Sequence, residues 1–280
     1  MRSPSPQFVI RPLQSPDDYR AFESLQKEVW GENVAEVVSG SMAAIVQKIG
    51  GIAAGAFDDS GQMVGLVFGF TGYRKGLLVH WSHMLAIREG KRDSGLGRQL
   101  KLYKREQLLK IGVDEVYWTF DPLVARNAFF NFNHLGVSAD EYAVDMYGPG
   151  DDSELFRGIG TDRLIVVWKI TKDYIKAVLE GRLTFDARPY VSAPFAVVRT
   201  VESDPFSQPL VNGVAGEERL RIEIPPDIHL LRDKSPGGAK AWREATRDAF
   251  VQAFAKQYEI AGFSRDNSSR RCFYCLCKAR

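Results

Sequence analysis

The sequence predicts a mixed α/β fold: a mixed β-sheet with helices on both faces, followed by a C-terminal α/β region. Short apolar runs are bounded by turn-forming residues, and longer segments repeat their apolar residues at three- and four-residue spacing. In chain order these give a strand, two helices, three strands, a helix, a strand, a helix and two strands. Such an order is typical of a sheet that is covered on both sides.

The first predicted domain comprises residues 1–171, and its elements follow from local patterns. The turn-forming cluster at residues 58–61 separates two apolar runs and predicts a hairpin. Helix 96–111 is expected to have an apolar side, namely Leu96, Leu100, Tyr103 and Leu108, with its lysines and arginines elsewhere. The expected strands are 8–12, 52–57, 63–71, 77–87, 116–120, 142–147 and 164–170, and the other expected helices are 16–30, 37–49 and 125–135.

A second region, residues 172–280, is long enough to be a domain of its own. We expect an irregular, proline- and glycine-rich connection over 188–216. The other expected elements are helices 174–183 and 239–258, strand 220–224 and a hairpin of strands 260–265 and 272–277. The order strand, helix, strand, strand echoes the latter half of the first domain. It suggests a degenerate half-repeat that packs on that domain.

The composition is that of an ordinary water-soluble protein. Hydrophobic residues make up 45% and charged residues 26% of the chain, and the formal net charge is only +2. This balance demands neither a nucleic acid nor an anionic membrane as partner. The N-terminus lacks an apolar secretory signal, and no segment approaches the ~20 apolar residues of a membrane span. We therefore expect a cytoplasmic protein without a nucleic-acid or membrane partner.

The three cysteines, Cys272, Cys275 and Cys277, lie close together near the C-terminus. Their odd number argues against a disulfide framework. A zinc site usually needs four ligands in two spaced pairs, and none of the four histidines is close to the cysteines in sequence. We favour a structural strand and predict no metal.

The sharpest local motif is the hexapeptide Arg92-Asp93-Ser94-Gly95-Leu96-Gly97, which follows a predicted strand and opens a helix. The first turn of a helix has unpaired backbone N–H groups and a positive dipole end. Glycines there let an anion approach the backbone closely. Nearby cations, Arg88, Lys91, Arg92 and Arg98, add attraction. The motif predicts a diphosphate site, and the alternative is a plain helix start with a glycine used for packing.

With this motif the chain resembles the GNAT superfamily of N-acyltransferases. Arg92, Gly95 and Gly97 fit the superfamily's pyrophosphate signature in register, and Ala128 precedes Gly136 by the eight residues found in its last site helix. The resemblance covers about residues 8–170 in element order. It implies acetyl-CoA or another acyl-CoA as co-substrate.

The resemblance also implies where the co-substrate lies. Strands 77–87 and 116–120 are expected to splay apart, so that the pantetheine arm pairs with the main chain of Leu85 and Ile87. The diphosphate is expected on the loop and first helical turn, that is on Arg92, Asp93, Ser94, Gly95, Leu96, Gly97 and Arg98. Asn127 and Phe130 are candidates for contact with the arm.

The proton donor for the leaving thiolate is harder to assign. Many relatives have a tyrosine four residues before the closing glycine, and here that place is Phe132, which has no proton to give. The asparagine usually found eleven residues before this glycine is Ala125. Candidate donors are Tyr147, Tyr142, His134 or a water, unless none is needed. Among these we favour Tyr147.

Histidines are the candidate bases that deprotonate the amine. His80 and His83 lie on the strand where relatives often place a carboxylate, and strand alternation directs them to opposite faces. A pKa of ~6.5 suits this role. We favour His83 because it is nearer to the expected amide contacts. The alternative is a histidine hydrogen-bonded within the sheet.

These features predict an enzyme that moves an acetyl or other short acyl group from acyl-CoA to a primary amine, with a small molecule or amino acid favoured as acceptor. One alternative is a GNAT-fold module that binds acyl-CoA, or a partner, without catalysis. Another is transfer to a protein's lysine or N-terminus. The second region is expected either to cover the acceptor side of the cleft or to build a homodimer, and the sequence leaves both open.

Overall fold

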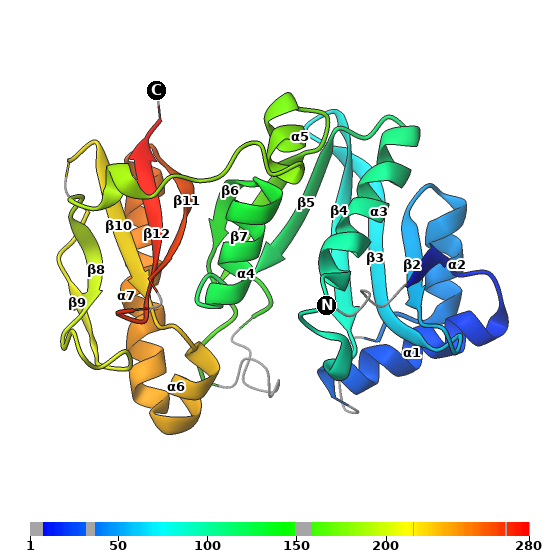
Figure 1. Cartoon of the computed structure of the whole chain (residues 1–280), viewed down its shortest axis with the longest axis horizontal. Helices are drawn as coiled ribbons and strands as arrows, with labels where there is room; N and C mark the ends of the chain where they lie inside the picture. The colour runs from blue at the N-terminus through cyan, green and yellow to red at the C-terminus, as the bar shows by residue number, and fades with distance from the viewer. Residues whose placement is uncertain (1–7, 32–36, 149–157, 215, 267, 280) are drawn as a thin grey trace, which may run out of the picture. The chain divides into compact units, whose positions relative to one another are not determined.

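The computed structural model describes residues 8–31, 37–148, 158–214, 216–266 and 268–279 (Figure 1). The chain forms two compact units. The first comprises Met1–Trp118 with Lys169–Thr171, and the second comprises Thr119–Trp168 with Lys172–Arg280. A domain boundary at residue 171 stays a prediction.

A mixed sheet forms the centre of the first unit. Its strands lie in chain order, neighbours are antiparallel up to β4, and the start of β5 is parallel to β4. The mixed α/β class predicted from the sequence is thereby confirmed. The strands are β1 (Val9–Pro12), β2 (Ile52–Phe57), β3 (Met63–Arg74), β4 (Leu77–Ile87) and β5 (Glu115–Phe120).

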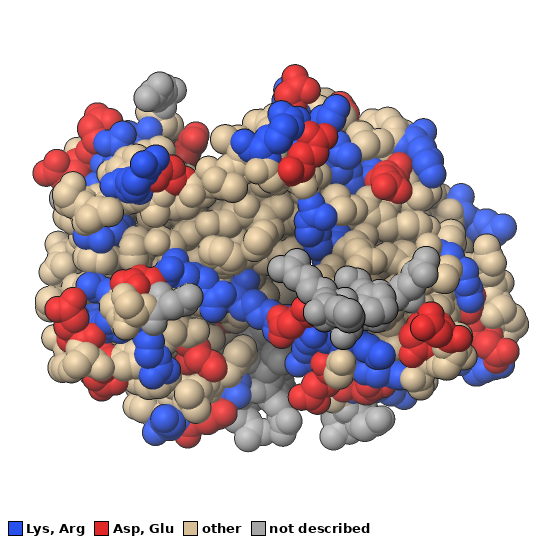
Figure 2. All heavy atoms as spheres, in the orientation of Figure 1, with Lys and Arg blue, Asp and Glu red and all other residues tan. Residues whose placement is uncertain are grey.

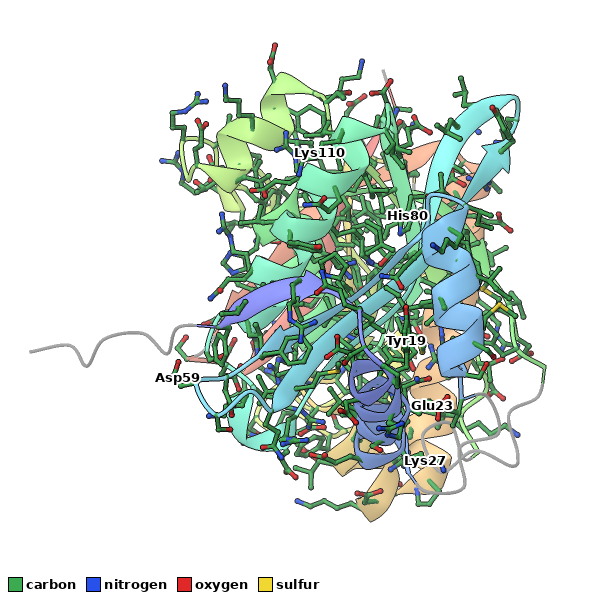
Figure 3. The ribbon with its side chains drawn as sticks, turned by 90° about the vertical axis from the view of Figure 1, so that its right-hand side faces the viewer. Tyr19, Glu23, Lys27, Asp59, His80 and Lys110 are labelled. Carbon is green, nitrogen blue, oxygen red and sulfur yellow. The ribbon has the colours of Figure 1, made fainter. Side chains whose placement is uncertain are left out.

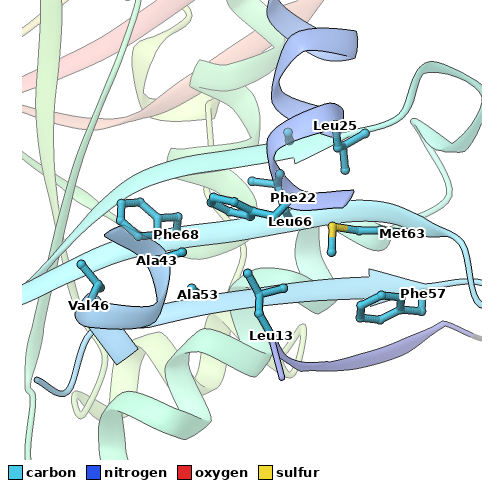
Figure 4. Packing of buried hydrophobic residues seen from close by; sticks show 11 residues of the cluster. Leu13, Phe22, Leu25, Ala43, Val46, Ala53, Phe57, Met63, Leu66 and Phe68 are labelled. Carbon is cyan, nitrogen blue, oxygen red and sulfur yellow. The ribbon is translucent and has the colours of Figure 1, made fainter. Parts of the chain in front are cut away.

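Helices cover both faces of this sheet, as expected. On one face α1 (Pro16–Trp30) and α2 (Gly40–Lys48) bury an apolar cluster in which the rings of Phe22 and Phe68 lie 5.9 Å apart (Figure 4). On the other face α3 (Leu96–Lys110) packs so closely that a Cβ atom on Gly65 would lie 3.1 Å from Leu96. A short 3₁₀ turn, Glu89–Lys91, connects β4 to the loop before α3.

The start of α1 illustrates how the sequence sets a boundary. Ser15 caps the helix, and Asp18 completes a capping box. The Asp18 carboxylate also accepts a 2.6 Å hydrogen bond from Arg11 of β1. This bond is the main reason that the pKa of Asp18 is lowered to about 2. The cap therefore also ties the helix to the neighbouring strand.

The second unit contains the antiparallel pair β6 (Ser138–Ala143) and β7 (Arg163–Lys169) and a five-stranded sheet in the order β11-β12-β10-β8-β9. The strands of this sheet are β8 (Phe195–Arg199), β9 (Pro209–Val211), β10 (Arg219–Ile224), β11 (Tyr258–Asp266) and β12 (Arg271–Lys278). Its helices are α4 (Ala125–Phe129), the π-helix η2 (Phe130–Leu135), α5 (Asp173–Leu179), the 3₁₀ turn η3 (Arg188–Tyr190), α6 (Ile228–Lys234) and α7 (Pro236–Ala255).

Two local predictions were wrong, and one helix was missed. Segment 188–216, expected to be irregular, contains β8 and β9, and helix α6 was not predicted. Both strands are short, and β9 is an edge strand that starts with Pro209, a residue that weakens a strand signal although edge strands tolerate it. The strand expected at 142–147 is Ser138–Ala143 instead. It pairs with β7 but is largely exposed, so its sequence lacks apolar alternation.

Other predictions about this unit hold. The helical pattern at 125–135 begins as an α-helix and continues as a π-helix, and Gly136 ends it in the left-handed conformation with φ of 70°. The predicted order strand, helix, strand, strand is present in β10, α7, β11 and β12, with β12 paired to both other strands. The origin of this arrangement as a half-repeat stays a prediction.

A buried charge network ties α7 to the β6–β7 pair. The Asp162 side chain is fully buried and accepts hydrogen bonds from the Tyr142 hydroxyl at 2.7 Å and from Arg247 at 2.6 and 2.8 Å. Burial raises the pKa of Asp162, but the bonds from Arg247 and Tyr142 outweigh it, so that the pKa is lowered. One turn earlier on α7, buried Arg243 donates to Asp121 at 2.6 Å.

We expect Asp162→Ala to destabilise the second unit by about 2–4 kcal/mol, because the buried Tyr142 hydroxyl loses its acceptor and Arg247 keeps only its ion pair with Asp145 at 3.1 Å. Urea unfolding followed by circular dichroism measures this loss. Asp248→Ala, on an exposed position of the same helix, is the matched control and should change stability by less than about 0.5 kcal/mol. An equally small loss in the Asp162 variant would contradict the assigned role of the network.

Candidate active site

The loop between β4 and α3 adopts the backbone that its glycines allow. Gly95 is the N-cap of α3, with φ of 82°, and no atom would meet a Cβ there within 4 Å. Asp93 also has a positive φ, 63°. The left-handed conformation at Gly95 turns the chain so that the first amides of α3 face outward. Arg92, Asp93 and Gly95 are exposed, whereas Leu96 is buried and anchors the helix to the sheet.

The backbone amides of this loop can bind an anion. Arg98 and Gln99 both direct their N–H groups to the carbonyl of Gly95. The four amides before them, those of Ser94, Gly95, Leu96 and Gly97, have no protein acceptor among the residues that the structure describes. Unpaired amides at the positive end of a 15-residue helix favour a negatively charged ligand.

Strand β4 is connected to this loop by the 3₁₀ turn, and one edge of β4 is partly unpaired. Its parallel pairing with β5 comprises only Val79, His80 and Trp81, opposite Glu115, Val116 and Tyr117. On the other side β4 pairs with β3 as far as Ile87. Over Ser82–Ile87, therefore, the edge on the β5 side has no strand partner within the first unit as described. The predicted contacts Leu85 and Ile87 lie on this half-buried edge, which can add an extended ligand as a further strand.

The two candidate base histidines differ sharply, as strand alternation predicts. His83 is exposed, with Phe70 and Phe68 as ring neighbours at 5.9 and 6.3 Å.

His80, by contrast, is completely buried on β4 (labelled in Figure 3). The Thr71 hydroxyl donates to the carbonyl of Gly50, so it accepts from Nδ1 of His80 at 3.0 Å. Burial, followed by repulsion from Lys104 and Lys101, lowers the pKa of His80 to about 2. His80 is therefore too weak a base for an amine.

The prediction that the lysines of α3 lie away from its apolar side was wrong for two of them. The side chains of Lys101 and Lys104 are buried, 5% and 0% exposed, on the same helix face as Leu100 and Leu108. Both ammonium groups approach the Ser82 hydroxyl of β4, Lys104 at 2.5 Å and Lys101 at 3.4 Å. The spacing of Lys101 and Lys104 matches the apolar side of the helix. Because lysine is rarely buried, however, the residue type argues against placing them there.

The remaining predicted residues belong to the second unit. Asn127 is exposed on α4, and Phe130 is half-buried at the start of the π-helix. Tyr147 is 49% exposed, and its hydroxyl lies 3.1 Å from that of Thr119. Tyr142, the alternative proton donor, is instead held in the buried network by Asp162. Thus the structure brings the loop and Leu85 and Ile87 together in one unit, whereas Asn127, Phe130 and Tyr147 are part of the other.

Phe132 has a purely structural setting in the second unit. Its side chain is 6% exposed, and its ring packs against Phe120 at 6.3 Å and Tyr274 at 5.9 Å. Position 132 is therefore part of the apolar core and offers no proton donor.

The described residues offer neither a metal site nor a membrane span. No group of three or more histidine, cysteine, aspartate or glutamate side chains is arranged to hold a metal ion, and the three cysteines are free. Within the same ranges, no helix has both the length and the apolarity to cross a bilayer. On the face shown in Figure 2, acidic and basic side chains are interspersed.

No protein-family model and no curated protein matches the chain. Among solved structures it is similar to the ribosomal-protein alanine N-acetyltransferase of Escherichia coli (19% identity, TM-score 0.44, 59% of this chain and 94% of that one). It is also similar to an aminoglycoside 6'-N-acetyltransferase complexed with coenzyme A (15%, 0.44, 58% and 97%). A GNAT acetyltransferase of Streptococcus pneumoniae is a third match (16%, 0.45, 57% and 98%).

Proposed function

We propose that this protein is an N-acyltransferase that moves an acetyl or other short acyl group from acyl-CoA to a primary amine, with a small molecule or amino acid as acceptor. One observation carries the proposal. Among the described residues, four amides at the start of α3 have no acceptor, and a short turn connects them to β4, whose edge on the β5 side has no strand partner beyond Trp81 within the first unit. This arrangement offers a place for a diphosphate beside a place for an extended amide-bearing arm.

In this proposal the diphosphate binds the amides of the loop, and Arg92 and Arg98 add positive charge. The pantetheine amides pair with the main chain of Leu85 and Ile87. Contacts of Asn127 and Phe130 with this arm stay a prediction. Because backbone groups make most of these contacts, the proposed site depends on the loop conformation more than on particular side chains.

In the proposed reaction the amine nitrogen attacks the thioester carbonyl carbon, so that a C–N bond forms and the C–S bond breaks. A base must take the proton from the attacking amine, and the thiolate must receive one. We propose His83 as the base because it is exposed next to the unpaired edge, whereas buried His80 cannot be protonated near neutral pH. We propose Tyr147 as the proton donor, since its hydroxyl is accessible.

We expect His83→Ala to lower kcat by about 100-fold or more at pH 7.5, the usual contribution of a positioned base. Acetyl-CoA affinity should change by less than threefold. Steady-state thiol release and calorimetry measure the two quantities. His229→Ala, an exposed histidine of α6, is the control. Wild-type kcat in the His83 variant would remove this residue from the mechanism.

The function itself is tested by calorimetry with acetyl-CoA, followed by thiol release across a panel of amino acids and small amines. Binding together with turnover of one amine class supports the enzyme and names its acceptor. Binding without turnover on a broad panel supports the second candidate, a non-catalytic acyl-CoA-binding module. The apolar setting of Phe132 favours that alternative, because it leaves no proton donor at this position.

A further inference from the structure

A pair of buried lysines in the first unit has no counter-charge. Neither Lys101 nor Lys104 forms an ion pair with a carboxylate among the described residues. The contacts they do make are with the Ser82 hydroxyl and, for Lys101, with the face of the Trp118 ring, whose centroid is 3.5 Å from Nζ. Lysine is almost never fully buried without a partner. Two lysine amines around one hydroxyl therefore form a site that has no carboxylate to balance the charge that they carry when protonated.

His80, a polar residue that interacts electrostatically with both lysines, offers no negative charge. His80 is on the same strand as Ser82, and its Nδ1 is bonded to Thr71, whereas its fully buried Nε2 has no hydrogen-bond partner. A neutral imidazole with a free lone pair leaves the local charge of the two lysines unbalanced. Burial and then repulsion from Lys104 lower the pKa of Lys101, and burial lowers that of Lys104 to about 7.

The lysine pair lies where β4 and β5 part. Trp81 and Tyr117 are the last paired residues of the two strands, and Ser82 and Trp118, which contact the lysines, are the next residue of each. Ile87 lies five positions after Ser82, which corresponds to about 16 Å along a strand. The anion-binding loop is therefore at one end of the unpaired edge of β4, and the lysines are at the other.

We propose that Lys101 and Lys104 bind a carboxylate carried on the acyl group, so that the co-substrate is the coenzyme A monothioester of a short dicarboxylic acid. The inference rests on the proposed function. An arm that is held by its diphosphate at the loop and paired along β4 directs its acyl end toward Ser82. A carboxylate arriving there accepts hydrogen bonds from both ammonium groups and supplies the missing charge.

The length-matched thioesters succinyl-CoA and butyryl-CoA test this inference, because they differ mainly in a terminal carboxylate. Calorimetry at pH 8 should show that wild-type protein binds succinyl-CoA at least tenfold more tightly than butyryl-CoA. Because the carboxylate restores the charge of Lys104, succinyl-CoA binding should also take up about one proton more, detected in buffers of different ionisation enthalpy. The variant Lys101→Met/Lys104→Met should reverse the preference, and Lys110→Met, at the exposed end of α3 (Figure 3), should retain it.

The outcomes separate this inference from the proposed function. Equal affinity of the wild-type protein for the two thioesters, with no difference in proton uptake, overturns the carboxylate site while acyl-CoA binding stands. Absence of binding for both thioesters and for acetyl-CoA overturns the proposed function and the inference with it. The wild-type comparison does not depend on whether the double variant folds.

Discussion

Gly97→Glu is expected to weaken coenzyme A binding at least 100-fold. Gly97 is the second residue of α3, and its amide is one of the four without an acceptor. A glutamate there places a carboxylate where the diphosphate is proposed to bind, so that like charges repel and the side chain fills the approach to the backbone. Calorimetric titration with coenzyme A measures the loss.

The Gly97→Ala variant separates charge from shape. A Cβ atom at this position would lie 3.3 Å from Cδ1 of Ile87, a contact that a small shift of a flexible side chain relieves. The alanine variant should therefore bind within about fivefold of wild type. A carboxylate in the first helical turn interacts favourably with the positive end of the helix dipole, so the glutamate variant should fold normally. Undiminished binding by that variant would show that the loop is not the diphosphate site.

Lys104→Met should stabilise the protein by on the order of 3–5 kcal/mol at pH 6. Lys104 is completely buried, and burial lowers its pKa from 10.5 to about 7. Between pH 7 and 10.5 the unfolded chain binds more protons at this position than the folded chain, so wild-type stability rises with pH across this window. Below pH 7 the folded protein carries the full cost of the buried charge. Methionine fills a similar volume and has no charge, which also relieves the repulsion on Lys101.

Urea unfolding of both proteins at several pH values measures this difference. The gain should be largest at or below pH 7 and shrink steadily toward pH 10.5, where a neutral amine costs little. Lys110→Met serves as control, because this lysine is exposed at the end of the same helix and should leave stability nearly unchanged at every pH. A gain that does not vary with pH would show that packing, and not the buried charge, is responsible.

Local signals in the sequence determined most of the first unit. The turn-forming cluster at 58–61 placed the hairpin of β2 and β3, and β4 has the predicted bounds 77–87. In the second unit, Gly136 likewise ends its helix in the left-handed conformation, because a glycine adopts positive φ without steric cost. The loop before α3 could also be predicted, since a glycine at a helix start allows the positive φ that Gly95 adopts, whereas its role as a diphosphate site stays a prediction. A strand–glycine–helix pattern predicts such a loop without any long-range contact.

Tertiary structure alone decided which polar side chains are buried and with what partners. Lysine is usually an exposed residue, yet the packing of α3 on β4 buries Lys101 and Lys104 against Ser82. His80 and His83 are chemically the same, but the sheet covers one and leaves the other accessible. The short strands β8 and β9 exist because neighbouring strands supply their hydrogen bonds. The pattern of a sequence encodes backbone conformation locally, whereas burial, and with it the pKa of each group, depends on residues that are distant in the chain.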